Sequence, residues 1–328
     1  MKAMLVNEEK RLVWSDVAEP ILCDDSIIID IEAVGINRAD ILQKNGKYPS
    51  PKGWPEWMGL EVAGTVIEMG KTAAERSCFK IGDKVCALLG GGGYAERVAA
   101  PYNMVMPIPK GLTVCEAASL PEAYATSYLN LFYEGHLEAG QTIYIAAGAS
   151  GLASAAIPLA KAFGAKVITS VLSADIAKRI EGLGADIVVD TSKQRLEDVF
   201  AELDKNGEPV NVTMDCLCGE TLGKCFQYMA EGGYWVVIST LAGTETNIQL
   251  RPLLTRGLHL VGSMLRKRSV EEKADILSLL AEKVWPKFKN GEIKPSVYKV
   301  LPMEKANEAH EILERGENVG KVVLALDK

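Results

Sequence analysis

The sequence has few of the residues from which metal sites are built. It contains 328 residues but only three histidines, His136, His259 and His310, which are scattered without the spacing of metal ligands. Its seven cysteines include no Cys-x-x-Cys pair. Structural zinc takes about four Cys or His ligands at short spacings, and an odd number of cysteines inside strand and helix patterns does not suit a disulfide framework. We therefore expect reduced cysteines and no bound metal.

The sequence also lacks long apolar runs and basic blocks. No segment approaches the roughly 18 apolar residues that a membrane span needs. The basic group at 266–268 is short, and the chain has a net charge of −7, so a nucleic-acid partner is not expected. The first residues resemble the start of a strand rather than a signal peptide, which makes a cytoplasmic location the expectation. These absences argue against a nucleic-acid or membrane partner.

A turn of small residues lies near the middle of the chain. The run 143–153 joins a short β-prone segment to Gly148, Ser150 and Gly151, and a helix pattern over 154–163 follows at once. Strand, tight turn and helix in this order allow backbone N–H groups to approach a pyrophosphate at the positive end of the helix. Taken alone, the turn is equally compatible with an ordinary Gly/Ala-rich helix start in an α/β core.

Strand and helix patterns alternate after this turn. The next predicted strand, 166–171, completes a strand-helix-strand unit. Further strands are predicted at 186–189, 210–216, 234–239 and 258–261, and helices at 173–182, 194–205 and 219–230. This alternation predicts an α/β fold with a doubly wound parallel sheet, the Rossmann type of nucleotide domain.

The two ends of the chain have a different pattern. Residues 1 to about 120 contain short strand patterns separated by glycine and proline, which is typical of an antiparallel, barrel-like β domain. The tail returns to this pattern with a strand, a helix and a strand between 299 and 326. We therefore predict a nucleotide domain, 122–262, inserted into a split β domain, 1–121 and 291–328, with a helical junction at 263–290.

Several motifs taken together resemble one enzyme family. In order along almost the whole chain they are GINRAD at 35–40, GKYP at 46–49, GLEVAG at 59–64, IGDKV at 81–85, the turn at 147–153 and NVGK at 318–321. The chain resembles the zinc-free quinone oxidoreductase branch of the medium-chain dehydrogenase/reductase superfamily. It is most similar to the tumour-suppressor-inducible group, through LLGGGGY at 88–94, MPIP at 106–109, PEA at 121–123 and LRKR at 265–268. The resemblance implies a GroES-like β-barrel-type catalytic domain and NADPH-dependent reduction of a quinone.

The resemblance assigns Asn37 and Tyr48 to catalysis. Zinc alcohol dehydrogenases have Cys at the place of Asn37 and His at the place of Leu60, so no zinc is implied here. Without a metal, the amide of Asn37 is expected to donate a hydrogen bond to a carbonyl oxygen. The phenol of Tyr48, in a Gly/Pro-rich loop, is expected to orient or protonate the acceptor oxygen.

The roles expected for two further pairs of neighbouring residues are less specific. Trp54 and Trp57 either line the acceptor pocket or anchor their Pro-rich loop. Arg38 and Asp40 are expected to form a structural polar pair.

The resemblance also implies cofactor-binding residues in both parts of the chain. Those expected near the pyrophosphate and the nicotinamide are Thr126, Ser150, Gly151, Leu152, Ile238, Ser239, Thr240, Leu265, Arg266 and Asn318. Those expected near the 2′-phosphate of NADPH are Ser173, Lys178 and Thr191.

A preference for NADPH is expected, weaker than in relatives that have the full basic pocket. Val171 ends the second strand, where an acidic residue would select NAD. The family has Lys and Tyr where this chain has Asp175 and Thr191, and Lys178 and Arg179 are the cations that could compensate.

Two other functions remain open. One is reduction of the C=C bond of an enone or enoyl thioester, and the other is a nucleotide-binding sensor or structural protein with little turnover, because fold alone does not settle function. Relatives in the resembled family join edge strands of their nucleotide domains, so a homodimer through the run 258–264 is expected.

Overall fold

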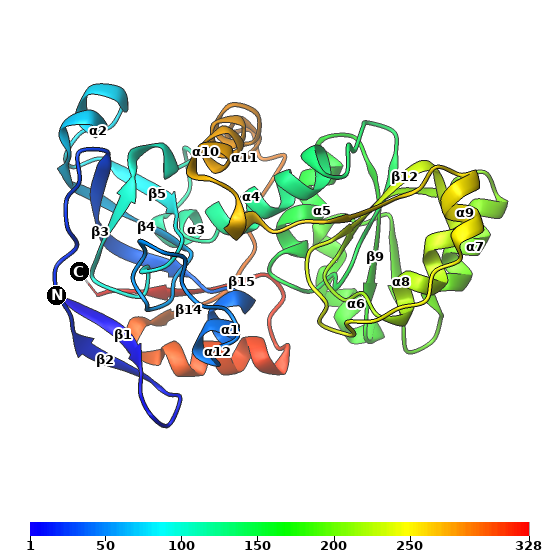
Figure 1. Cartoon of the computed structure of the whole chain (residues 1–328), viewed down its shortest axis with the longest axis horizontal. Coiled ribbons are helices and arrows are strands. Elements are labelled where there is room, and N and C mark those ends of the chain that lie inside the picture. Colours follow the sequence, from blue (N-terminus) through cyan, green and yellow to red (C-terminus); the bar gives the residue numbers. More distant parts are fainter. Residues whose placement is uncertain (328) are drawn as a thin grey trace. The chain divides into compact units, whose positions relative to one another are not determined.

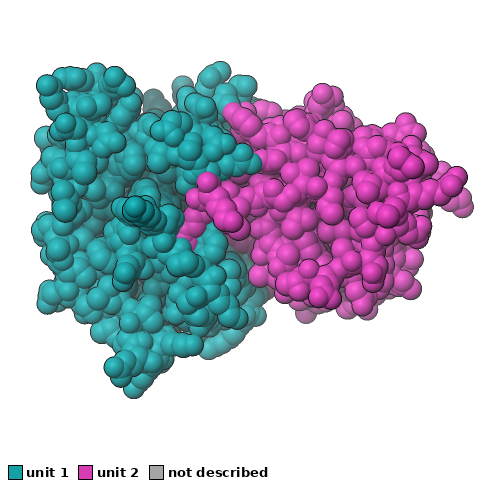
Figure 2. Space-filling view, in the orientation of Figure 1, with its two compact units in different colours: residues 1–125, 268–328 teal, residues 126–267 magenta. Residues whose placement is uncertain are grey.

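The computed structural model describes residues 1–327, so Lys328, the last residue of the predicted tail, lies outside it. The chain divides into two compact units, coloured separately in Figure 2: unit 1 is residues 1–125 and 268 onward, and unit 2 is residues 126–267. Within the described residues 1–327, no helix has the length and apolar character that crossing a membrane requires.

Unit 2 contains a six-stranded sheet in which all pairs are parallel (Figure 1). Its strands, in the order β10-β9-β8-β11-β12-β13, are Ile187–Asp190, Lys166–Val171, Thr142–Ile145, Val210–Asp215, Met229–Val237 and His259–Gly262. Its helices are α5 (Ala153–Ala162), α6 (Ala174–Ile180), α7 (Leu196–Lys205), α8 (Glu220–Cys225) and α9 (Leu250–Thr255). Counted from β8, the strand order is 3-2-1-4-5-6, that of a dinucleotide-binding sheet. The predicted doubly wound sheet is therefore confirmed.

The apolar spacing of α7 explains its packing on this sheet. Leu196, Val199, Phe200 and Leu203 recur at helical intervals and are the buried residues of the helix. Phe200 meets Tyr144 of β8 edge-on, with ring centroids 5.5 Å apart. Contacts of this kind add to the apolar burial that holds helix and sheet together.

The helix predicted at 219–230 is shorter than expected. Helix α8 ends at Cys225, a 3₁₀ turn spans Phe226–Tyr228, and β12 already begins at Met229. Cys225, Phe226 and Met229 all pack in the core cluster of the unit. Because their burial continues the helical apolar spacing beyond the end of the helix, periodicity alone could not locate that end.

Unit 1 is built on a mainly antiparallel sheet. Its path β14-β15-β3-β4-β5-β7 consists of Val297–Pro302, Lys321–Ala325, Ser26–Gly35, Glu61–Met69, Lys84–Leu88 and Val105–Pro107, and β6 (Arg97–Pro101) also pairs with β3. A separate hairpin joins β1 (Lys2–Val6) to β2 (Leu12–Asp16). The pair β14-β15 is parallel, because α12 (Ala306–Arg315) connects the two strands as a crossover helix. The predicted strand-helix-strand tail thus adds one parallel pair to an otherwise antiparallel domain.

The remaining helices of unit 1 are α1 (Arg38–Lys44), α2 (Lys71–Arg76), α3 (Val114–Ala117), α10 (Val270–Leu279) and α11 (Trp285–Lys289), and α4 (Pro121–Tyr128) begins in this unit. Helices α1 and α12 lie side by side (Figure 1), and Arg38 Nη2 donates to the carbonyl oxygen of Leu313 at 2.7 Å.

Residues 268–290, predicted as part of a separate junction, fall within unit 1. Trp285 Nε1 donates to the carbonyl oxygen of Pro107 at 2.8 Å, and Phe288 meets Tyr124 edge-on.

Candidate functional site

The small-residue turn of unit 2 follows the carboxyl end of β8, and α5 begins directly after it. A Cβ added to Gly148 would stand 2.5 Å from Thr169 Oγ1 on β9, so only glycine lets the turn pack this closely on its neighbouring strand. Gly148 N donates to the carbonyl oxygen of Ser170 at 2.9 Å, which ties the turn to β9. Close packing between turn and strand is what a dinucleotide-binding turn requires.

Ser150 helps to begin α5. Its Oγ accepts a hydrogen bond from Ala153 N at 3.1 Å, as a capping side chain does. Ser150, Gly151 and Leu152 are half-buried. The turn therefore places three residues of the expected pyrophosphate site together beside the start of a ten-residue helix.

Ser173 and Thr191 both lie next to the end of β9. Ser173 caps α6 by accepting a hydrogen bond from Ile176 N, and Thr191 donates from both N and Oγ1 to the carbonyl oxygen of Val171, at 2.9 and 3.0 Å. Asp190 pairs with Val171 in the parallel register, which brings the ends of β9 and β10 together. The structure thus places two of the three residues expected near a 2′-phosphate at one sheet edge.

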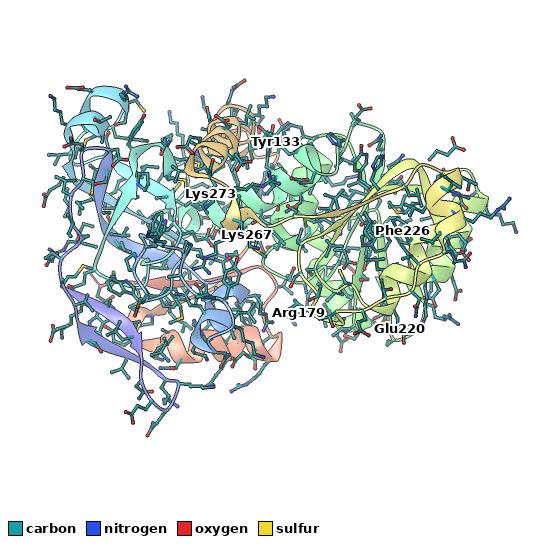
Figure 3. The ribbon with its side chains drawn as sticks, viewed as in Figure 1. Tyr133, Arg179, Glu220, Phe226, Lys267 and Lys273 are labelled. Carbon is teal, nitrogen blue, oxygen red and sulfur yellow. The ribbon has the colours of Figure 1, made fainter. Side chains whose placement is uncertain are left out.

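The expected cations lie further along α6. Lys178 and Arg179 are in its last turn, and Figure 3 labels Arg179 there, whereas the acidic Asp175 is in the first turn beside Ser173. An α-helix rises about 1.5 Å per residue. The backbone of Lys178 is therefore more than a full helical turn from the capping Ser173.

The other expected cofactor residues of unit 2 follow strands β12 and β13. Ile238 N donates to the carbonyl oxygen of Asp215 at 2.9 Å, and the carbonyl oxygen of Ser239 accepts from Cys218 Sγ at 3.1 Å. Thr240 comes next, while Leu265 and Arg266 lie in a 3₁₀ turn after β13. Thr126 lies on α4, and its carbonyl oxygen accepts from Asn130 Nδ2 at 2.7 Å. Most of this set thus follows the carboxyl ends of parallel strands, where open α/β sheets bind ligands.

Asn318 belongs to unit 1, in the segment between α12 and β15. Its Nδ2 donates to the carbonyl oxygen of Gly320 at 2.7 Å. This bond shapes the turn that leads into β15.

Asn37 takes part in a buried polar network of unit 1. Its Nδ2 donates to Glu61 Oε1 at 2.9 Å, and its Oδ1 accepts from Lys321 Nζ at 2.6 Å. Glu61 is fully buried and Lys321 is 5% exposed. The amide therefore bonds to two charged side chains inside unit 1, and this favours a supporting role for Asn37 over the expected donation to an acceptor carbonyl.

Arg38 and Asp40 do not form the expected pair. Arg38 donates to the backbone of α12, as described above. Asp40 is fully buried and accepts from Asn37 N at 2.7 Å, from Gly59 N at 3.2 Å and from Tyr94 Oη at 3.3 Å. Burial raises the pKa of Asp40 to about 6, although these backbone hydrogen bonds act in the opposite direction.

Tyr94 continues this chain of polar contacts into the core. Its hydroxyl lies 3.0 Å from His310 Nε2, and both side chains are fully buried. Burial lowers the pKa of His310 to about 3, so the imidazole is neutral at pH 7.

Glu122 stands at the start of α4 beside the network. Its backbone N–H donates to Glu61 Oε2 at 2.9 Å. Burial raises the pKa of the Glu122 carboxyl to about 7; the charges of Glu61 and Asp40 raise it further, while those of Lys321 and Lys273 lower it. Lys273 is a buried residue of α10 and is labelled in Figure 3.

Sequence reasoning assigned no role to Glu61, Lys321 or Glu122. The available signal was a charge at the start of a largely apolar strand pattern: Glu61 begins the run EVA, and Lys321 precedes VVLA. A charge in such a place needs a buried partner of opposite sign. The two charges satisfy each other, with Lys321 Nζ 2.6 Å from Glu61 Oε1.

Tyr48 lies half-buried in the loop between α1 and β4. The loop is held from both sides, because Gln43 Nε2 donates to Ser50 Oγ and to the carbonyl oxygen of Glu56, at 3.1 and 2.8 Å. Trp57 Nε1 donates to the carbonyl oxygen of Gly92 at 3.0 Å. Gln43 thus ties the loop that carries Tyr48 to α1, and Trp57 ties it to the glycine run 90–93.

The two tryptophans of this loop are held by different contacts. Trp57 is an anchor through its hydrogen bond to Gly92. Trp54 packs against the core of unit 1 and against Gly90, where an added Cβ would stand 2.6 Å from the indole ring. Both therefore serve as packing residues, and the half-buried Trp54 is also partly accessible.

The described residues 1–327 contain no group of three or more His, Cys, Asp or Glu side chains arranged to hold a metal ion. At the two places where zinc alcohol dehydrogenases have ligands, this chain has Asn37, which bonds to Glu61 and Lys321, and the buried apolar Leu60.

Two family models match the chain. The alcohol dehydrogenase GroES-like domain matches residues 23–110, and the zinc-binding dehydrogenase model matches residues 151–282. Together they span most of the chain and both units.

Curated relatives match over nearly the full length. A quinone oxidoreductase-like protein 2 homolog from Nematostella vectensis is 29% identical over 96% of this chain and 88% of its own length. The quinone oxidoreductase of Mus musculus is 27% identical over 99% of this chain and 98% of its own length. A third kind of relative is much longer: the chain is 31% identical to a part of the lovastatin diketide synthase of Aspergillus terreus, over 93% of this chain and 12% of the synthase.

Solved structures share the fold. A mycobacterial protein complexed with NADPH is 27% identical and has a TM-score of 0.85, and the match covers 99% of each chain. The CurK enoyl reductase, at 23% identity and a TM-score of 0.84 over 99% of both chains, is a likeness of fold alone. The matched domains, the full-length relatives and the 3-2-1-4-5-6 sheet agree. The chain is therefore an oxidoreductase of the medium-chain dehydrogenase/reductase superfamily, and the full-length relatives that it resembles include a quinone oxidoreductase.

Proposed function

We propose that this chain reduces a quinone with NADPH and without a metal ion. The observation that carries the proposal is the turn 146–152, which packs on β9 through Gly148 and presents Ser150, Gly151 and Leu152 beside the start of α5. A similar structure is complexed with NADPH, and similar full-length proteins are named quinone oxidoreductases.

The residues of unit 2 fit a dinucleotide. The turn residues would hold the pyrophosphate. Ser173 and Thr191, which both lie next to the end of β9, would face the adenosine ribose. Buried Val171 at this strand end places no carboxylate against a 2′-phosphate. Asp175 in the first turn of α6 weakens the preference for NADPH, because its charge repels the phosphate.

Bound NADPH would supply a hydride to the acceptor. The quinone must also take up one proton to become a hydroquinone, so the chain has to orient the acceptor and provide a path for this proton. We assign orientation to Tyr48, whose phenol can donate a hydrogen bond to the acceptor oxygen. Trp57 fixes its loop on the glycine run, and Gln43 ties the loop to α1. A hydrogen-bond donor held in place stabilises a transition state more than a mobile one does.

The role proposed for Asn37 is support of this acceptor side. Its amide bonds to Glu61 and Lys321, and its backbone N–H donates to Asp40. Zinc independence is part of the proposal, because an amide and the apolar Leu60 occupy the places of two zinc ligands. Elemental analysis that found one equivalent of tightly bound zinc would contradict this part.

The first test follows NADPH consumption with a 1,2-quinone and an enoyl thioester side by side. Faster consumption with the quinone is the expected result. Faster consumption with the thioester would make the chain a C=C reductase instead. Binding of NADPH without turnover of either acceptor would leave a nucleotide-binding protein and refute the proposed reaction.

Substitution of Tyr48 by Phe tests its assignment. The loss of one well-placed hydrogen-bond donor should lower kcat for the quinone about 10- to 100-fold and leave the Kd for NADPH within about twofold. Tyr102→Phe, at another half-buried tyrosine of unit 1, is the matched control and should change neither value. An unchanged kcat in Tyr48→Phe would contradict the assignment of acceptor orientation to Tyr48.

A further inference from the structure

Lys321 places a positive charge inside unit 1. The side chain is 5% exposed, and its Nζ donates to the carbonyl oxygen of Ile36 at 2.9 Å, to Asn37 Oδ1 at 2.6 Å and to Glu61 Oε1 at 2.6 Å. An ammonium group has three N–H bonds and no acceptor. All three N–H bonds therefore donate to protein oxygens. Any effect of Lys321 on the reaction must pass through these three partners.

Glu61 extends this arrangement to a second element. Its Oε1 faces Lys321 and Asn37, while its Oε2 accepts from the backbone N–H of Glu122 in the first turn of α4. The carboxylate therefore caps the start of α4, where the helix dipole favours a negative charge. Thr126 follows Glu122 by four residues on the same helix.

The two charges also fix the orientation of the Asn37 amide. A lysine can only donate, so the Oδ1 atom must face Lys321; an ionised carboxylate can only accept, so the Nδ2 atom must face Glu61. The reversed amide would place N–H against ammonium and oxygen against carboxylate. The side chain has one satisfied orientation, and the backbone N–H of the same residue is held by Asp40.

Stability alone does not account for this pair. Replacing a buried ion pair by apolar residues is often neutral or stabilising, because the desolvation of two charges offsets their attraction. Lys321 and Glu61, in contrast, join the end of β3, the start of α1, the start of β4, the start of α4 and the start of β15. Glycine at 35 is also required here, since a Cβ would stand 2.4 Å from Glu61 Oε1.

We propose that Lys321 is a positioning residue for the reaction: with Glu61 it fixes Asn37 and the start of α4, and so sets the geometry of the acceptor side of unit 1. This inference rests on the proposed reductase function. The proposed role of Lys321 is to position Asn37 and the start of α4. This role is separable by experiment from neutralisation of the buried charge of Glu61.

The test compares Lys321→Met, Glu61→Gln and the double variant. Lys321→Met leaves a buried carboxylate without its cation, so the midpoint of thermal unfolding should fall. The double variant removes both charges and should recover most of this fall. Its kcat/KM for the acceptor should nevertheless stay about tenfold or more below that of the wild-type chain, because the three-point attachment of Lys321 is still missing. The Kd for NADPH should remain within about twofold, since the cofactor residues lie largely in unit 2.

An exposed ion pair of the same unit provides the matched control. Lys299 on β14 pairs with Glu308 on α12 at 3.0 Å, and both side chains are more than 40% exposed. In the double variant Lys299→Met, Glu308→Gln, the midpoint of thermal unfolding should stay within about two degrees of that of the wild-type chain. Its kcat/KM should stay within about twofold, as expected for a surface pair.

Chemical rescue provides a second readout. In Lys321→Ala, methylammonium or ethylammonium ions should restore part of kcat/KM, whereas tetramethylammonium, which has no N–H bond, should not. The inference would be overturned if the double variant regained activity together with stability, or if alkylammonium ions restored the unfolding midpoint without activity. Failure of the proposed function would be visible in the wild-type chain itself, as absence of turnover with either acceptor, and would overturn both.

Discussion

The indole ring of Trp54 packs on Gly90 so closely that a Cβ built on the glycine would stand 2.6 Å from three ring atoms. The neighbouring glycines are similarly constrained: a Cβ on Gly91 would meet Ser50 Oγ at 2.9 Å, and one on Gly92 would meet the ring of Pro55 at 2.8 Å. The glycine run 90–93 is thus the surface on which the Tyr48 loop rests. The loop and the run determine each other's position.

Gly90→Ala should therefore displace Trp54 and, with it, the loop that carries Tyr48. We expect a loss of about 1–3 kcal/mol in the free energy of unfolding, typical of overpacking, and a larger proportional loss in kcat/KM for the acceptor than in NADPH affinity. Denaturant titration and steady-state kinetics measure the two effects. Gly182→Ala, where an added Cβ meets nothing within 4 Å, is the control and should be neutral. Wild-type kinetics in Gly90→Ala would show that the loop tolerates movement.

The raised pKa of Glu122 predicts how stability depends on pH. In the folded chain burial raises its pKa from 4.5 to about 7, so between these values the folded state binds more protons than the unfolded state. Its contribution to stability is therefore fully present below pH 4.5 and is lost as the pH rises through 7. Glu122→Gln should remove this loss and be more stable than wild type at pH 8, by about 1–2 kcal/mol after allowance for water at the half-buried carboxyl.

The pH prediction is checked by denaturant unfolding at several pH values between 5 and 8.5. The difference between variant and wild type should grow with pH through the region near 7. A constant difference across this range would mean that Glu122 does not titrate there. Glu116→Gln, at the half-buried glutamate of the capping box of α3, is the control and should show no such growth.

Asp175 should limit the use of NADPH. It lies in the first turn of α6, beside the capping Ser173. Asp175→Lys replaces a repelling charge by an attracting one, so NADPH affinity should rise about 3- to 30-fold while NADH affinity changes little. Asp198→Lys makes the same charge change in the first turn of α7 and is the control. Fluorescence titration with both nucleotides is the measurement, and equal gains for NADPH and NADH would contradict a 2′-phosphate site at this position.

Strand β13 should be the contact of the expected homodimer. It is the last strand of the six-stranded sheet, and Leu260 on it is 47% exposed. An exposed edge with apolar side chains can pair with another copy, and lysine on such an edge opposes pairing. Leu260→Lys should therefore give a monomeric mass in solution, whereas Ile81→Lys, at a 67% exposed turn residue of unit 1, should not. A wild-type chain that is monomeric at micromolar concentration would contradict the dimer.

Local features of the sequence were sufficient to predict much of unit 2. The alternation of strand and helix patterns predicts the parallel sheet, and the small residues 147–152 predict the turn before α5. The ends of α8 could not be predicted, because Cys225, Phe226 and Met229 are all buried and continue the helical period after the helix has ended. Short-range patterns report burial, and burial does not by itself distinguish a helix end from a strand start.

The polar network of unit 1 could not be derived from local pattern. Asn37 is separated from Lys321 by 284 positions and from Glu61 by 24. Their contact depends on β15 lying beside β3 and on β3 lying beside β4, which only the assembled sheet determines. The sequence therefore suggested Asn37 as a donor to substrate, and the structure assigns its amide to internal partners.

The position of β15 has a consequence for how the protein is made. This strand lies between β14 and β3 in the sheet of unit 1, although the whole of unit 2 separates it from β3 along the chain. A ribosome adding about 5–20 residues per second needs roughly 15–60 seconds to pass from Asn37 to Lys321. During that interval the nascent β3 has an open edge, while unit 2 has all its strands and can fold first. The acceptor side of unit 1 would then be the last part of the nascent chain to fold, and the part most dependent on a chaperone.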